Sequence, residues 1–190
     1  MRSRSILLVL MVLFAASMNS GKLFGQSGSS VQKKGITGQQ APEWAVSTWH
    51  QLPEGKSKLK VGDFKGKVLY LYFFQSWCPG CHSQGFPTLK SLHGKYKDDK
   101  EVGFAVIQTT FEGHRVNTAS KLKSTAAKYK LPIPFGQSAG DSGTPEIMRK
   151  YRSGGTPWVV VVDKSGKVQY NDFHVSPEKA SKLIERLKKK

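Results

Sequence analysis

The amino-acid sequence predicts an α/β fold in which helices flank a central mixed sheet. Residues 69–74 form a continuous apolar and aromatic run, the composition expected of a strand covered on both faces, and residues 102–108 are expected to form a second buried strand. A segment with helical spacing lies between them, and two strands joined in this way form a right-handed parallel unit. A third apolar run, residues 159–162, precedes a turn and a returning strand, so we expect antiparallel pairing in the same sheet.

Two long helices are predicted from the spacing of apolar residues. Residues 79–97 are expected to be helical because Leu89 and Leu92 recur at helical intervals, with a kink at Pro87. Residues 118–130 have the pattern of a second helix. These two helices would follow the first and second strands of the parallel unit.

The segment after the second helix contains two prolines in residues 131–136 and is expected to be a connection or a short extended piece. Thr144 is predicted to cap a short helix, with Pro145 at the first helical position and an end near Tyr151.

The C-terminal part of the sequence predicts a β-hairpin and a closing helix. Residues 163–166, Asp-Lys-Ser-Gly, have turn composition, and residues 167–173 are expected to return antiparallel. Ser176 is the expected start of the final helix, which carries an apolar stripe that includes Leu183 and Leu187.

The N-terminus has the three regions of a secretory signal peptide. Arg2 and Arg4 precede an apolar stretch over residues 6–16, and small and polar residues follow. We therefore expect residues 1–25 to be a signal peptide, with an uncleaved membrane anchor as the alternative, and a periplasmic or other extracytoplasmic location.

Domain organisation follows from composition. Residues 26–40 are rich in Gly, Ser and Gln and are expected to form a flexible linker, so a single domain is predicted over residues 41–190. The formal net charge is +17, with lysines spread over many segments, which is typical of a solvated surface. This charge favours weak contact with anionic surfaces or acidic proteins, whereas no nucleic-acid-binding motif accompanies it.

Both cysteines of the chain fall in residues 77–82, which have the sequence Trp-Cys-Pro-Gly-Cys-His. If a helix begins near Cys78, its free N–H groups and the positive end of its dipole favour the thiolate of that residue. Cys81 lies one turn further on and can attack a mixed disulfide formed on Cys78. The sequence therefore predicts a redox-active pair with Cys78 as nucleophile and Cys81 as resolving thiol, in an exported chain that has no other cysteine.

Two other chemistries use the same residues. With His82 included, the motif also matches the C-x-x-C-H attachment site of a c-type haem, which would be expected in a helical domain. A copper-binding module would use Cys78, Cys81 and His174 for a soft ion such as Cu(I).

Four sequence features together resemble the exported thioredoxin-like proteins of the TlpA/ResA type. They are an Ala-Pro pair at residues 41–42, the lead-in at residues 64–68, the Trp-Cys-x-x-Cys motif at residues 77–81, and Gly-Thr-Pro at residues 155–157. The resemblance covers residues 41–189 and implies a thioredoxin-like fold, with an N-terminal extension and an insertion after the second core strand.

The resemblance also implies a function. Proteins of this type are thiol-disulfide oxidoreductases without a cofactor or metal, most of them reductases of exported proteins that depend on a membrane electron donor. It further implies that Pro157 is cis and faces the dithiol, that the backbone of Thr156 pairs with the bound polypeptide, and that Trp77 packs beside the site.

The chain departs from the thioredoxin pattern at three places. Tyr72 stands six residues before Cys78, where thioredoxins have a buried acid, and a phenol is a poor base at neutral pH. Pro87 comes nine rather than eight residues after Cys78, which predicts a bulge around Gly85. Residues 108–146 are longer than in minimal thioredoxins, so we expect an extra helix and loops there.

Three further side chains are candidates for proton transfer near the dithiol. Ladder geometry in the predicted hairpin places His174 opposite Thr156 or Pro157, near the dithiol. There it would move protons or help to hold a metal or substrate. The alternative is an ordinary histidine at the end of a strand. Glu112 and His114 follow the end of the second core strand, where sites of open α/β sheets gather.

Overall fold

The computed structural model describes residues 33–139 and 143–190. The expected signal peptide and the part of the expected linker before residue 33 lie outside the described residues. Among the described helices, none is long and apolar enough to cross a membrane.

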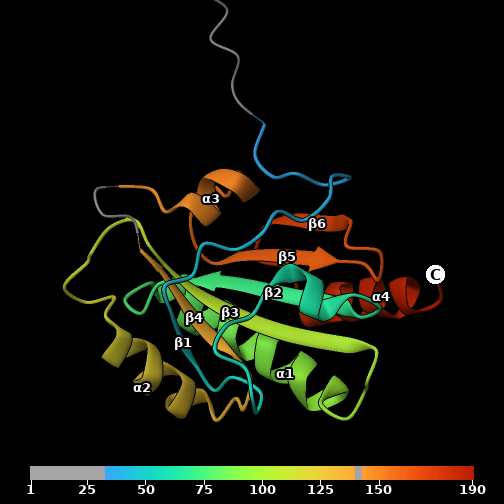
Figure 1. Cartoon of the computed structure of the whole chain (residues 1–190), viewed down its shortest axis with the longest axis horizontal. Helices are drawn as coiled ribbons and strands as arrows, with labels where there is room; N and C mark the ends of the chain where they lie inside the picture. Colours follow the sequence, from blue (N-terminus) through green and yellow to red (C-terminus); the bar gives the residue numbers. More distant parts are fainter. Residues whose placement is uncertain (1–32, 140–142) are drawn as a thin grey trace, which may run out of the picture. The chain divides into compact units, whose positions relative to one another are not determined.

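A six-stranded mixed sheet in the order β1-β4-β3-β2-β5-β6 forms the centre of the domain (Figure 1). Its strands are β1 (Thr48–His50), β2 (Val68–Phe74), β3 (Val102–Thr110), β4 (Phe135–Ala139), β5 (Trp158–Val162) and β6 (Val168–Phe173). β2, β3 and β4 are parallel, whereas β5 pairs antiparallel with both β2 and β6, and β1 pairs antiparallel with β4. This arrangement confirms the predicted α/β thioredoxin-like fold.

The helices cover both faces of this sheet. They are α1 (Phe86–Tyr96), α2 (Ala119–Tyr129), α3 (Glu146–Tyr151) and α4 (Pro177–Lys188), with a 3-10 turn over Val61–Phe64. Side chains of α1, α2 and α4 form one core with alternate residues of β2, and α3 forms a second core with the remaining residues of that strand. All seven residues of β2 are buried, which explains its continuous apolar run.

Residues 34–40 correct the predicted domain boundary. They were expected to belong to a flexible linker, but Gly38 donates to Val168, and Val168 donates back to Gln39, with N···O distances of 2.8 and 2.9 Å. Ile36 is buried in the second core. The segment therefore belongs to the domain, because it pairs with the outer edge of β6 and supplies a core side chain.

For residues 131–136, where a connection or a short extended piece was expected, the structure has a connection that becomes strand β4 from Phe135 and pairs with β3. One local prediction differs from the structure. Thr144 is not the cap of α3, because Pro145 takes the capping position with an extended ψ of 148° and the helix begins at Glu146.

Candidate active site

Cys78 lies where the chain leaves β2 and turns into helix, as predicted. Residues 79 and 80 are already helical, and the backbone N–H of Cys81 donates to the Cys78 sulfur with an N···S distance of 3.3 Å. Both cysteines are free thiols. Cys78 is 6% exposed and Cys81 is fully buried, so Cys78 is the thiol that a protein substrate meets first.

A cis-proline loop faces the dithiol. The Thr156–Pro157 peptide bond is cis, in agreement with the prediction. The Cys78 sulfur lies 3.6 Å from the carbonyl oxygen of Thr156, to which the thiol donates. A Cβ atom on Gly80 would come within 3.3 Å of the Pro157 ring, so the loop packs directly against the first helical turn.

Cys81 begins a π-helical turn, Cys81–Gly85, that precedes α1. This turn accounts for the extra residue between Cys78 and Pro87 and confirms the predicted bulge. Burial raises the pKa of the Cys81 thiol to about 12, and a hydrogen bond from Tyr72 acts in the opposite direction. At neutral pH Cys81 is therefore protonated and must lose its proton before it can react.

His82 does not fit the role of a haem ligand. Its Nε2 lies 2.7 Å from the carbonyl oxygen of Ser76, and its Nδ1 lies 2.7 Å from the hydroxyl of Tyr129. Because a carbonyl only accepts, Nε2 carries the proton and Nδ1 accepts from the tyrosine in the neutral imidazole. Both ring nitrogens are thus occupied within the protein, and the mixed sheet replaces the helical domain that the haem alternative requires.

A buried polar network holds the loop before the dithiol. The Asn117 side chain accepts from the Ser76 N–H at 2.7 Å and donates to the carbonyl oxygens of Glu112 and Gly113. The Ser76 hydroxyl donates to the Gln108 side chain. Ser76, Gln108 and Asn117 carry no sequence signal of a site, since they come from separate segments and each has the composition of an ordinary loop or strand end.

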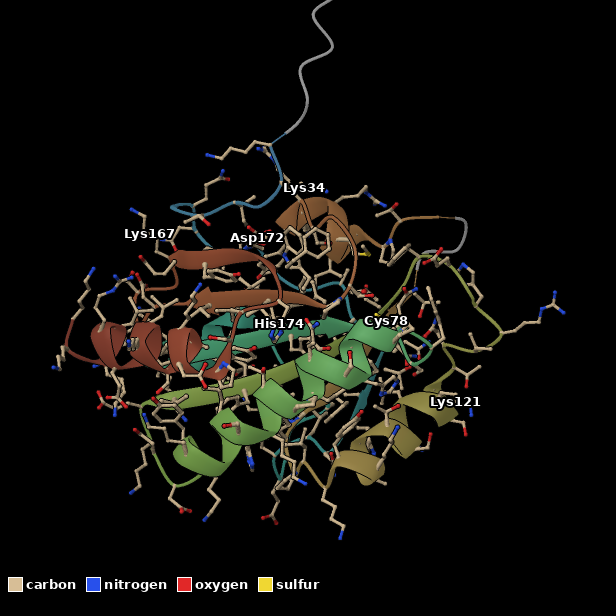
Figure 2. All side chains as sticks on the ribbon, turned by 180° about the vertical axis from the view of Figure 1, so that it is seen from behind. Lys34, Cys78, Lys121, Lys167, Asp172 and His174 are labelled. Carbon is tan, nitrogen blue, oxygen red and sulfur yellow. The ribbon has the colours of Figure 1, made fainter. Side chains whose placement is uncertain are left out.

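The side chains of the three predicted proton carriers take no part in this network. His174 directly follows Phe173, the last residue of β6, which pairs with Trp158 beside the cis-proline. Figure 2 labels His174 and Cys78. The Nδ1 of His174 is buried without a hydrogen-bond partner among the described residues, and burial lowers the pKa of the ring. The side chains of Glu112 and His114 are exposed, and Glu112 contributes its backbone carbonyl to the network. Among the described residues, no group of three or more His, Cys, Asp or Glu side chains is arranged so that it could hold a metal ion.

Three exposed apolar side chains, called the apolar rim below, lie on segments next to the dithiol and the cis-proline. Within residues 33–139 and 143–190, the exposed large apolar side chains are Trp77, Val116 and Phe173. Trp77 and Val116 both lie against Gly113, within 3.2 Å of where its Cβ would be. Phe173 packs on Trp158, the residue that directly follows the cis-proline, with ring centroids 4.9 Å apart. The rim thus combines a residue next to Cys78 with a residue that packs beside the cis-proline loop.

Alkylation should distinguish the two thiols. At pH 7 we expect iodoacetamide to label Cys78 and to leave Cys81 unmodified, because Cys81 is fully buried and its pKa is raised to about 12. Peptide mapping by mass spectrometry would measure labelling at each site. The Cys81→Ser variant should keep the label and Cys78→Ser should lose it; preferential labelling of Cys81 would contradict this assignment.

A dithiol at the start of a helix, opposite a cis-proline on this mixed sheet, defines a dithiol oxidoreductase of the thioredoxin fold. The Redoxin family profile matches residues 36–187, which is most of the chain. The chain therefore belongs to the Redoxin family, and it is a thiol-disulfide oxidoreductase similar to ResA.

Individual relatives agree with this assignment. The thiol-disulfide oxidoreductase ResA of Bacillus cereus is 29% identical over 168 residues, covering 88% of this chain and 87% of that protein. The crystal structure of a thioredoxin-like superfamily protein matches with a TM-score of 0.73 and 29% identity over 80% of this chain and 97% of its own. A thiol-disulfide isomerase from Corynebacterium glutamicum matches with a TM-score of 0.69 and 27% identity, over 79% of this chain and 97% of its own.

Proposed function

We propose that this protein reduces disulfides of exported proteins through a mixed disulfide on Cys78. The observation that carries the proposal is the position of the Cys78 sulfur, which accepts the N–H of Cys81 and lies 3.6 Å from the Thr156 carbonyl oxygen. Helix N–H groups stabilise the negative charge of a thiolate, and the carbonyl on the other side offers a backbone partner for an extended substrate segment.

The reaction transfers two electrons from the dithiol to the substrate. The Cys78 thiolate attacks one sulfur of a substrate disulfide, and the other substrate sulfur leaves as a thiolate and takes a proton from solvent. Cys81 then loses its proton to solvent and attacks the Cys78 sulfur. This step releases the second substrate thiol and leaves a Cys78–Cys81 disulfide, which a membrane-bound dithiol donor reduces for the next cycle.

The apolar rim supports a polypeptide substrate. A small disulfide would not need exposed aromatic side chains next to the reactive cysteine and beside the cis-proline loop, whereas an extended segment gains apolar contacts with Trp77 and Phe173 as its backbone pairs with Thr156. The signal-peptide composition of residues 1–25 supports an extracytoplasmic location for these substrates, and the net charge of +17 favours acidic partners or anionic surfaces.

Trapping tests this proposal. The Cys81→Ser variant of the full chain, expressed with its native N-terminus, should accumulate disulfide-linked complexes with extracytoplasmic proteins, because the mixed disulfide on Cys78 is no longer resolved. Non-reducing electrophoresis followed by mass spectrometry would identify the partners. The Cys78→Ser variant is the matched control and should trap none.

A second substitution in the trapping variant tests the rim. Trp77→Ala should reduce the yield of trapped protein severalfold while reaction of Cys78 with a small disulfide stays within about twofold, because only the polypeptide uses the apolar contacts. Trapping of cytosolic proteins alone, or equal trapping by Cys78→Ser, would contradict the proposal.

A further inference from the structure

Tyr72 stands out because its hydroxyl reaches the resolving cysteine. The side chain is fully buried in β2, and its Oη donates to the backbone carbonyl of Cys81 at 3.4 Å. The hydroxyl therefore lies beside Cys81, where it lowers the pKa of the Cys81 thiol against the raising effect of burial. Two aromatic neighbours pack against its ring: Phe86 in a T-shaped arrangement at a centroid distance of 5.3 Å and Phe74 stacked at 6.3 Å.

The local backbone is built around this phenol. A Cβ atom on Gly85 would lie 2.0 Å from the Tyr72 hydroxyl, closer than any side chain can approach. Gly85 is the last residue of the π-helical turn that begins at Cys81. The extra residue of that turn and the missing side chain of Gly85 together leave room for the hydroxyl beside Cys81.

Tyr70 shows that this contact is not a general property of buried tyrosines in β2. It lies two residues earlier on the same face and is fully buried in the same core. Its hydroxyl, however, finds no hydrogen-bond partner among the residues that the structure describes. The chain thus offers two buried phenols in one strand, only one of which reaches the dithiol.

The chemistry of the resolving step needs a hydrogen-bond donor at this position. Cys81 must become a thiolate inside the core, where a negative charge is poorly solvated. The groups that face its thiol are Tyr72, Cys78 and Tyr129, and His82 follows it in the chain. Burial holds the pKa of Tyr72 well above its ordinary value, so the phenol keeps its proton and acts as a donor, not as a base.

We propose that Tyr72 is a positioning residue for resolution: its hydroxyl, admitted by Gly85, turns its hydrogen from the Cys81 carbonyl to the Cys81 thiolate as that thiolate forms. The inference rests on the proposed roles of Cys78 as nucleophile and Cys81 as resolving thiol. Tyr72 takes no proton from Cys81; the proton leaves to solvent, and the phenol lowers the free energy of the charged sulfur.

Ellman's reagent separates the two steps in the reduced full chain. The Cys78 thiolate forms a mixed disulfide with one half of the reagent and releases the other half as a coloured thiolate. Cys81 then attacks the Cys78 sulfur, closes the protein disulfide and releases the second coloured thiolate. Stopped-flow absorbance therefore reports attack as a first phase and resolution as a second phase.

For Tyr72→Phe we expect the rate of the first phase to stay within about twofold of the wild type. The second phase should be slowed about tenfold at pH 7, because the variant loses one hydrogen bond to a charged group. The pH–rate profile of the second phase should move up by about one pH unit, because the thiolate then forms at higher pH. Tyr70→Phe, the matched control, should change neither phase.

Gly85→Ala provides an independent variant. The methyl group of the new alanine must displace the Tyr72 phenol. Gly85→Ala should therefore slow the second phase when made in the wild-type protein, but add little further slowing when made together with Tyr72→Phe. An unchanged second phase in Tyr72→Phe, equal slowing by Tyr70→Phe, or equal slowing of both phases would overturn the inference. Loss of the first phase in the wild type would instead refute the role of Cys78 and hence the proposed function.

Discussion

Replacement of Cys78 by serine is expected to reduce disulfide reductase activity by a thousandfold or more, to the background of the assay. The hydroxyl of serine cannot attack a disulfide, and the remaining thiol of Cys81 is fully buried. The turbidity assay of insulin reduction with a dithiol donor measures this loss.

Cys81→Ser is the comparison that assigns the roles. It should also abolish turnover, but it should still consume one equivalent of a small disulfide, because Cys78 remains able to form the mixed disulfide. Turnover by Cys78→Ser above a tenth of the wild-type rate would rule out Cys78 as the nucleophile.

Replacement of Phe86 by alanine is expected to lower the free energy of unfolding by about 3–5 kcal/mol, the usual cost of removing a buried aromatic side chain. Phe86 is fully buried at the first position of α1, beneath the dithiol. Its ring stacks on Tyr129 with centroids 4.2 Å apart and meets Phe74 edge-on at 5.0 Å. The cavity left by its removal would lie within this aromatic cluster.

Urea unfolding followed by circular dichroism measures the change. Phe173→Ala is the control, because Phe173 is 38% exposed and its principal aromatic contact is with Trp158, so its loss should cost about 1 kcal/mol. Equal destabilisation by the two substitutions would show that Phe86 is not the centre of the cluster that supports the active site.

The core of the fold was predictable because its signals are local. β2 and β5 appear as unbroken apolar runs, and β3 is largely apolar up to Ile107, since a strand covered on both faces favours apolar side chains at successive positions. α2 and α4 begin at Thr118 and Ser176, whose side chains cap them as their residue types suggest.

The short edge elements were not predictable in the same way. β1 has three residues, and β4 carries a glycine and polar residues, so neither has a strand pattern of its own. β4 is a strand because it pairs with the edge of β3, and β1 is a strand because it pairs with the edge of β4. Ile36 likewise lies in a segment of linker composition and is ordered only through its contacts with the second core.

The sequence by itself determined the reactive pair, the order of the main elements and, through Gly-Thr-Pro, the loop that faces the pair. Only the tertiary structure decided which thiol meets a partner, how Asn117 and Gln108 hold the loop, and that Tyr72 reaches Cys81 through the space at Gly85. The reason is physical: motifs and periodicity depend on neighbours in the chain, whereas burial and hydrogen bonding depend on neighbours in space that the sequence separates by tens of residues.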